Sequence, residues 1–388
     1  MTNSYHLAID ASNVQSGGGF THLSQLLSSY KPDRYGITKI TIWTSKNVAD
    51  KLPDRPWIYK KNNFWVERNL LIRFFWQQLL FSSNIKNEKC DILFSPGGTI
   101  PLRLSVPVVS MSQNMLPFEK KEARFFGSYS LMYIKMMLLR YIQGRSFKNS
   151  DGMIFLTNYA YDSLSKILNT SFDNSSIIPH GIESRFFQKP RHQKSLDSFT
   201  SENPFRLLYV SILMPYKHQC EIAYAAKKLH DMGFHIEMMF IGPSWSWYGS
   251  KFSSLIELLD PAHKFLIWNG DESFNTLHRS YKDSDAFVFG SSCENLPNIL
   301  LEAMASGLPI ASSDSGPMPE VLSDSGIYFD PLNIDSISSS LLKIMKEAHL
   351  RESLSTLSWN RSKQYTWEKC ANQTFEFIHS IISKVKIK

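Results

Sequence analysis

The order of apolar runs and helical patterns constrains the fold of this 388-residue chain more than any other feature. Short runs rich in Val, Ile, Leu and Phe alternate with stretches of helical periodicity, and the alternation occurs twice along the chain. Such a βαβ pattern predicts parallel sheets with helices on both faces. Because one hydrophobic core stops growing at about 250–300 residues, the sequence predicts an α/β protein of two doubly wound domains.

A polar segment, residues 189–203 (KPRHQKSLDSFTSEN), separates the two regions and is typical of an interdomain linker. We therefore expect a Rossmann-like N-terminal domain over residues 1–188 and a second one over residues 204–366. A last helix over residues 367–388 is expected to return to the N-terminal domain. Ligands of such sheets bind at the carboxyl ends of the strands, so two facing domains would form one cleft.

The expected strands and helices follow from the same alternation. The expected strands are residues 6–9, 40–44, 92–95, 106–111, 153–156, 177–178, 206–210, 236–241, 264–268, 286–289, 309–311 and 327–329. The expected helices of the second half are residues 220–232, 271–282, 297–306, 334–348 and 367–382.

Cysteine usage and the absence of targeting patterns indicate a cytoplasmic protein. The four cysteines lie far apart, with neither metal-binding spacing nor a disulfide framework. The first ten residues lack a basic region followed by an apolar one, so we expect no signal peptide. No run of about 18 apolar residues predicts a transmembrane helix.

The charge is unevenly distributed. Residues 1–200 carry 25 Lys and Arg against 14 Asp and Glu, whereas the remainder carries 17 against 21. A basic half favours anionic partners such as phosphates, nucleic acid or an acidic membrane surface. Residues 64–81 and 124–148 also mix aromatic, apolar and basic side chains. They are typical either of helices at a membrane interface or of ordinary amphipathic helices packed on a sheet.

The most informative stretch for function is residues 293–322 (CENLPNILLEAMASGLPIASSDSGPMPEVL), which follows an apolar strand. Pro297 is expected at the first position of a helix, where its missing N–H is not needed. The free backbone amides that follow, with the helix dipole, favour anionic oxygens such as those of a diphosphate. The residues expected to bind such a donor here are Asn295, Leu296, Pro297 and Asn298.

Two glutamates flank this helix start. Glu302 lies within the apolar run ILLEAMA, where an unpaired carboxylate would be costly, and the two hydroxyls of a ribose would satisfy it. Glu294, in the preceding turn, is placed to accept hydrogen bonds from hydroxyls of a transferred sugar. The alternative is that Glu302 lies on a solvated helix face. The order of strand, turn, proline-started helix and Gly-Leu-Pro stop weighs against that alternative.

With the E-x7-E spacing from Glu294 to Glu302, followed by EAMASGLPI, SGPMPEVL and GIYFDP, the chain resembles the retaining glycosyltransferases of family 4, the group 1 glycosyl transferases. Among them it resembles bacterial O-antigen and capsule glycosyltransferases. The resemblance implies the GT-B fold, in which two Rossmann-like domains face each other. It also implies that the second glutamate holds the ribose and the first contacts the donor sugar.

The resemblance extends to other segments of the second half. In LLYVSILMPYKH, Lys217 takes the place of the lysine that contacts the donor diphosphate, while Ile212 replaces an arginine that the family often has. IGPSWSW and WNGDE match the edges that bind the base, which implies donor contacts by Gly242 and Asn269.

In the first half, the segment QSGGGFTHL matches the family's glycine loop, whose backbone can approach a sugar or phosphate closely. SQNMLPF occupies the place of a loop that often supplies a catalytic histidine, but its Gln and Asn do not titrate near neutrality. The residues expected to act here are Gly17, Gly18 and Gly19 on the donor, Gln113 in catalysis, and Asn114 and His180 on the acceptor side. A structural role remains the alternative for His180.

The resemblance implies a hexosyltransferase that moves a sugar from a UDP- or GDP-sugar to a hydroxyl with retained anomeric configuration. The acceptor we expect is a saccharide on polyprenyl diphosphate at the anionic inner face of the plasma membrane. No cofactor or metal is expected, because we see no DxD-type acidic pair placed to hold a metal, and no nucleic-acid partner is expected. A sugar-nucleotide epimerase of the same fold and a non-catalytic nucleotide-sugar-binding subunit remain alternatives.

Overall fold

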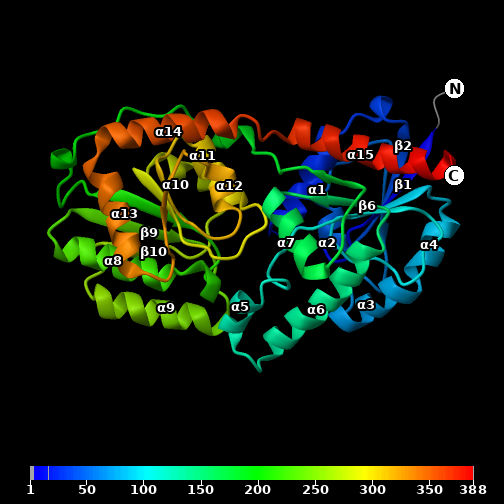
Figure 1. The fold of residues 1–388 in the computed structure, drawn as a ribbon, viewed down its shortest axis with the longest axis horizontal. Coiled ribbons are helices and arrows are strands. Elements are labelled where there is room, and N and C mark those ends of the chain that lie inside the picture. The colour runs from blue at the N-terminus through cyan, green and yellow to red at the C-terminus, as the bar shows by residue number, and fades with distance from the viewer. Residues whose placement is uncertain (1–3, 16, 388) are drawn as a thin grey trace. The chain divides into compact units, whose positions relative to one another are not determined.

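The computed structural model describes residues 4–15 and 17–387, which divide into two compact units (Figure 1). The first unit comprises the described parts of Met1–Phe118, Leu131–Gly181 and Thr366–Lys388. The second comprises Glu119–Ser130 and Ile182–Tyr365. The division differs from the expected boundaries because a short segment of the N-terminal half belongs to the second unit. The last helix belongs to the first unit, as expected.

The first unit contains a seven-stranded parallel sheet in the order β3-β2-β1-β4-β5-β6-β7. Its central strands are buried along their whole length, as parallel strands covered on both faces must be. The strands are β1 (Tyr5–Asp10), β2 (Ile37–Thr44), β3 (Ile58–Asn62), β4 (Ile92–Ser95), β5 (Val108–Met111), β6 (Gly152–Phe155) and β7 (Ser175–Ile177).

Helices cover both faces of this sheet. Right-handed crossovers place α1 on one face, and α3 and α6 on the other, because the chain moves across the sheet in opposite directions at these connections. Figure 1 shows this arrangement, with α15 beside α1. The helices are α1 (Gly17–Ser29), α2 (Lys46–Ala49), α3 (Leu70–Leu79), α4 (Phe81–Asn87), α6 (Leu131–Lys148), α7 (Asn158–Leu168) and α15 (Trp367–Ile387).

The second unit contains a six-stranded parallel sheet in the order β10-β9-β8-β11-β12-β13. Its strands are β8 (Phe205–Val210), β9 (Ile236–Ile241), β10 (Leu266–Trp268), β11 (Ala286–Phe289), β12 (Ile310–Ser313) and β13 (Ile327–Phe329). Its helices are α5 (Lys120–Ala123), α8 (Gln219–Asp231), α9 (Ser246–Leu259), α10 (Leu277–Lys282), α11 (Asn298–Ala305), α12 (Met318–Leu322), α13 (Ile334–Lys346) and α14 (Ala348–Ser362). The prediction of two doubly wound α/β domains is confirmed.

Several elements depart from the sequence prediction. Strand β3 was missed because its sequence, IYKKN, is not an apolar run. It lies at the edge of the sheet, where charged side chains are common. Helices α9, α12 and α14 were also missed. The two aromatic basic stretches are α-helical only in part. In residues 64–81 the α-helical part is Leu70–Leu79 and the first residue of α4, and in residues 124–148 helix α6 begins at Leu131.

The segment expected to be a linker, residues 189–203, packs within the second unit instead. Arg351 is fully buried and donates to the side chain of Gln193 at 3.1 Å, while its other nitrogens donate to backbone carbonyls, including those of Ile344 and Met345. Arg191 donates to the carbonyl of Lys282 at 3.0 Å. The sequence prediction was wrong here because polar residues with buried partners resemble a solvated linker in composition.

Within the part of the chain that the structure describes, no helix is both long enough and apolar enough to cross a membrane. The four cysteines, Cys90, Cys220, Cys293 and Cys370, are all buried as free thiols.

Candidate functional site

The residues singled out in the second half come together where the strand order of the second sheet reverses. Strands β8 and β11 are neighbours, and the chain crosses from β8 toward one edge and from β11 toward the other. Ligands of doubly wound sheets bind at the carboxyl ends of the strands at such a point. The loop after β8 and the loop after β11 are tied there by a hydrogen bond from the Ser292 amide to the Tyr216 carbonyl at 2.9 Å.

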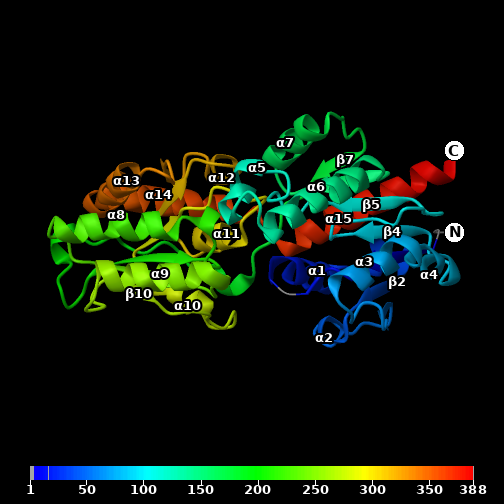
Figure 2. The ribbon, with the colours of Figure 1, turned by 90° about the horizontal axis from the view of Figure 1, so that it is seen from below.

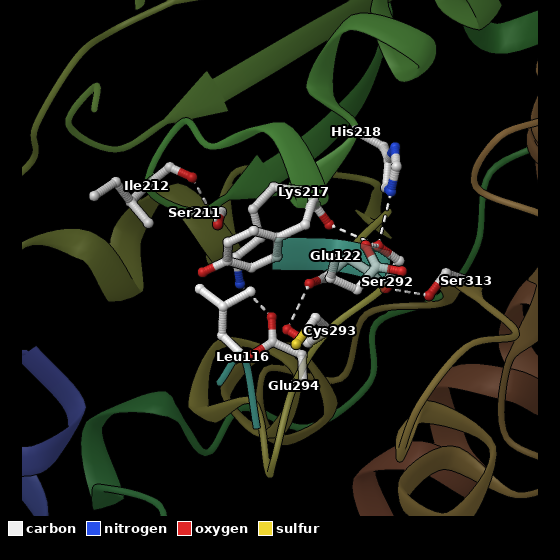
Figure 3. A network of polar contacts seen from close by, with 12 residues as sticks. Leu116, Glu122, Ser211, Ile212, Lys217, His218, Ser292, Cys293, Glu294 and Ser313 are labelled. Atoms are coloured by element: carbon white, nitrogen blue, oxygen red, sulfur yellow. Dashed lines mark hydrogen bonds and ion pairs between the residues drawn. The ribbon is translucent and has the colours of Figure 1, made fainter. Parts of the chain in front are cut away.

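Lys217 and Glu294 form an ion pair between these two loops (Figure 3). Both side chains are largely buried, at 8% and 16% exposure respectively. The Tyr209 hydroxyl donates to the carbonyl of Lys217 at 2.7 Å, which fixes the backbone that carries the lysine. A buried ammonium group that already has an ionic partner has lost its hydration on folding. It can therefore exchange that partner for an anionic ligand without a further large desolvation cost.

A second polar network adjoins the ion pair. The ring of His218 lies 2.9 Å from the Ser292 hydroxyl, which also lies 2.6 Å from a carboxylate oxygen of Glu122 (Figure 3). His218 has a positive φ of 54° and precedes α8. This network positions the two loops, and sequence reasoning missed it because Glu122 is 170 residues away from Ser292 along the chain.

Glu302 is buried in α11, as the ribose hypothesis requires, and is only 8% exposed. The Tyr281 hydroxyl donates to its carboxylate at 3.1 Å. Burial raises the pKa of Glu302 to about 7, although the hydrogen bond from Tyr281 acts in the opposite direction. A carboxylate with one neutral donor and little solvent can still accept hydrogen bonds from further hydroxyls. The alternative of a solvated helix face is wrong.

Helix α11 begins at Asn298, with Pro297 as the preceding cap residue, so the expected start at Pro297 is one residue early. The first backbone N–H groups of a helix have no acceptor within it and carry the positive end of its dipole. The side-chain oxygen of Asn298 is buried without a hydrogen-bond partner among the described residues. Asn295 and Leu296 are buried in the turn before the helix.

The ends of β9 and β10 carry the other predicted donor residues of this unit. Gly242 has a φ of +142°, and a Cβ built on it would lie 2.1 Å from the carbonyl oxygen of Ser211. Its amide donates to the Gly270 carbonyl, and Asn269 follows β10 directly. Ile212 presents no charge at the position where the resemblance implies an arginine, so Lys217 is the cation next to the ion-paired glutamate.

In the first unit, Gly17, Gly18 and Gly19 form the first turn of α1 rather than a loop, and Ser16 lies outside the described residues. A Cβ built on Gly19 would lie 3.3 Å from the side-chain oxygen of Gln113, so the structure brings these two predicted residues together. Asn114 is exposed and accepts a hydrogen bond from the amide of Leu116 at 3.0 Å.

His180 does not fit its predicted place on the acceptor side. It is buried, and its Nδ1 lies 2.9 Å from Nδ1 of His22. Burial lowers the pKa of both imidazoles, and that of His22 to about 4. Trp367 of α15 packs against both rings. These contacts favour a structural role for His180 in joining α1 to α15.

Sequence reasoning also missed Tyr281, which contacts Glu302 from α10. No pattern in the sequence relates two residues that are 21 positions apart on different helices. Among the described residues, no group of three or more His, Cys, Asp or Glu side chains is arranged to hold a metal ion.

The comparisons with known proteins agree with this geometry. Residues 191–358 match the family model described as Glycosyl transferases group 1. O-antigen chain mannosyltransferase B of Escherichia coli is 34% identical over 94 residues, which are 24% of this chain and 25% of that protein. The match thus spans about a quarter of that relative's length.

Two solved structures are similar over almost the whole chain. Sucrose-phosphate synthase of Thermosynechococcus elongatus has a TM-score of 0.77 at 13% identity, covering 98% of this chain and 100% of its own. HepE of Anabaena, solved in complex with UDP, has a TM-score of 0.70 at 14% identity, covering 97% and 100%. At these identities the likeness shows a shared fold.

Proposed function

Because residues 191–358 match the group 1 glycosyltransferase family model and the chain has the GT-B fold, we propose that it transfers a sugar from a nucleoside diphosphate to a hydroxyl group. The observation that carries the proposal is the position of Glu302, Lys217 and Glu294. All three lie in or beside the loops that follow β8 and β11, where the strand order reverses. Their chemistry matches the ribose, diphosphate and sugar of such a donor.

Lys217 and the amino end of α11 bind the diphosphate in this proposal. In the ligand-free chain Glu294 neutralises Lys217. A donor diphosphate would compete for the ammonium group and release the Glu294 carboxylate to accept hydrogen bonds from the sugar. Cation and helix amides would then stabilise the charge that develops on the leaving diphosphate.

Glu302 accepts hydrogen bonds from the two ribose hydroxyls. Its present donor, Tyr281, occupies one carboxylate oxygen, and the unpartnered Asn298 oxygen lies at the start of the same helix. Gly242 and Asn269, at the ends of neighbouring strands, contact the base. HepE was solved with UDP, which supports a uridine donor without excluding guanosine.

The proposed reaction retains the anomeric configuration and needs no metal or cofactor. The bond between the sugar carbon and the diphosphate oxygen breaks while the acceptor oxygen bonds to the same carbon from the same face. The acceptor proton passes to the departing diphosphate oxygen, because Gln113 is not a base near neutral pH. Gly17, Gly18 and Gly19 contact the donor, and Asn114 contacts the acceptor.

The proposed acceptor is a saccharide on polyprenyl diphosphate, in the synthesis of a bacterial surface polysaccharide. One relative is an O-antigen mannosyltransferase, and the basic first half of the chain suits a diphosphate-linked lipid in an anionic membrane. The protein would then work as a peripheral protein at the inner face of the plasma membrane.

The test is a transfer assay with UDP- and GDP-sugars and lipid-linked saccharide acceptors, in which nucleotide release and the anomeric configuration of the product are measured. Lys217→Met should lower turnover at least about 100-fold, as loss of a donor to a developing anion does elsewhere. Lys217→Arg, which keeps the charge, should retain more activity than Lys217→Met.

The matched control is Lys343→Met, which removes an exposed lysine of α13 in the same unit and should leave turnover unchanged. Release of nucleotide without a glycosylated product, or conversion of the donor sugar into an epimer, would contradict the proposed transfer.

A further inference from the structure

The first unit carries an apolar surface whose chemistry the sugar-transfer site does not explain. Helices α3 and α6 lie on the same face of the first sheet, below it in Figure 1 and toward the viewer in Figure 2. Arg145 of α6 donates to the side chain of Gln78 of α3 at 3.1 Å and to the carbonyl of Ile100 at 2.9 Å. The bond to Gln78 joins the two helices at their C-terminal ends.

The outward side of α6 is apolar, which is unusual for a helix packed on a sheet. Its inward side is also apolar, with Met136, Ile142 and Phe147 buried. On the outward side, large apolar residues recur every three or four positions. They are Leu131, Ile134, Leu138 and Tyr141, and their exposed fractions lie between 57% and 86%. A helix that only packed on the sheet would present polar residues there.

Helix α3 repeats the pattern. Leu71, Phe75 and Leu79 follow one another at four-residue spacing and are between 59% and 67% exposed. Trp76 and Gln77 on the opposite side are buried. Together the outward sides of α3 and α6 form what we call the α3–α6 surface, defined by these three residues and the four of α6. Exposed apolar residues gathered on neighbouring helices in this way usually mark an interaction site.

Positive charge accompanies the α3–α6 surface. Helix α6 contains Lys135, Arg140, Arg145 and Lys148 and no acidic residue. Within the described residues none of these four cations pairs with a carboxylate: the arginines donate to backbone carbonyls and to Gln78. Their charge therefore remains available to an anion outside the chain.

Three of these cations surround one cavity. It has a volume of about 510 Å³ and is lined by Arg140, Arg145 and Lys148 together with Met137 and Tyr141, and no carboxylate lines it. A cavity with cationic and apolar walls next to an exposed apolar stripe suits a phosphate group attached to hydrocarbon. A protein partner would have to place carboxylates opposite these cations. It would not require a long, unbroken row of exposed apolar residues, whereas a lipid layer would.

We propose that the α3–α6 surface docks on a lipid bilayer, with its apolar residues in the interfacial layer and the cavity on α6 around an anionic lipid phosphate. Helices with one apolar face and nearby Lys and Arg bind membranes in this orientation. The biological role of the docking rests on the proposed function, since it would bring the first unit to a lipid-linked acceptor. The docking itself needs no sugar donor.

The experiment measures cosedimentation of the full chain with vesicles of phosphatidylcholine alone or with 30 mol% phosphatidylglycerol (about one anionic lipid in three, as in many anionic membranes). The wild type should bind the anionic vesicles at low salt and lose binding as salt is added. Phe75→Ser with Leu138→Ser should lower the partition coefficient at least about 10-fold. Lys135→Glu with Lys148→Glu should lower it about 25-fold or more on anionic vesicles.

The matched controls change equally exposed residues of the second unit: Leu258→Ser with Leu332→Ser, and Lys264→Glu. They should bind as the wild type does. Donor binding to soluble nucleotide-sugar, measured without vesicles, should be unchanged in every surface variant, so loss of docking is distinguished from failure of the proposed function. Equal vesicle binding by the surface variants and the wild type would overturn the proposal. The proposal would also be overturned if the wild type did not bind vesicles but formed a dimer, and if Phe75→Ser with Leu138→Ser dissociated that dimer.

Discussion

At the scale of single residues, the proposed donor site depends on ionisable groups that the fold buries before any ligand binds. Glu302 is the extreme case, because burial raises its pKa to about 7 while Tyr281 is its hydrogen-bond donor. An ordinary glutamate titrates near 4.5. The native state therefore holds a proton on Glu302 that the unfolded chain releases between these two pH values, and ionising Glu302 destabilises the apo fold.

The resulting prediction concerns stability and pH. The native state binds more protons than the unfolded state between pH 4.5 and 7, so the free energy of unfolding falls as pH rises through this window. Glu302→Gln removes the ionisation and keeps an acceptor for Tyr281. We expect it to stabilise the second unit by on the order of 3 kcal/mol at pH 8 and by less than about 1 kcal/mol at pH 5.

Urea unfolding of the wild type and Glu302→Gln at both pH values checks this prediction. Glu257→Gln, an exposed glutamate of α9, serves as the control and should have little effect at either pH. A Glu302→Gln protein that is less stable than the wild type at pH 8 would mean that the carboxylate is stabilised by partners other than Tyr281.

At the scale of elements, the site is made by strand ends and the turns that follow them. The loop after β8 carries Lys217, and the loop after β11 carries Glu294. Gly242 directly follows β9, where the backbone of Ser211 passes closely. These loops are short, and their positions follow from the register of the parallel strands.

Gly242 provides a test at this scale. Its φ of +142° favours glycine, and an added Cβ would lie 2.1 Å from the Ser211 carbonyl oxygen. We expect Gly242→Ala to destabilise the second unit by more than about 3 kcal/mol, because the backbone must move as well as adopt a strained φ. Donor affinity should also fall.

Gly233→Ala is the matched control, because Gly233 also has a positive φ, +89°, but open space where a Cβ would be. It should cost about 1–2 kcal/mol, from backbone strain alone, and leave donor binding unchanged. If urea unfolding gave the same loss of unfolding free energy for both substitutions, the close contact between Ser211 and Gly242 would not be what restricts this position to glycine.

Elements that are apolar and regularly patterned could be predicted from the sequence, and those held by specific partners could not. Strands β4, β9, β11 and β13 have the predicted bounds because each is a mostly apolar run bounded by polar, Gly or Pro residues. The edge strand β3 lacks this pattern. Glu302 could be singled out from its apolar surroundings, whereas its donor Tyr281 depends on how α10 packs against α11.

At the scale of the whole molecule, the alternation of strands and helices predicts two doubly wound units, but the path of the chain between them follows from tertiary contacts. Residues 119–130 belong to the second unit through contacts such as that of Glu122 with Ser292. Residues 189–203 are fixed by Arg351. The excess of basic residues in the first half, by contrast, can be read from the sequence alone and favours an anionic partner. Helix α6 carries four of these basic residues and no acidic one.

The central claim is that the second unit binds a nucleoside diphosphate sugar through Glu302, and calorimetric titration tests it most directly. UDP- and GDP-sugars are titrated into the wild type, Glu302→Gln and Glu257→Gln at pH 8. The account predicts micromolar to millimolar binding of at least one donor by the wild type and Glu257→Gln, and affinity at least about 10-fold lower in Glu302→Gln, whose amide cannot form charge-assisted bonds to the ribose. Undiminished donor binding by the stably folded Glu302→Gln protein would contradict it.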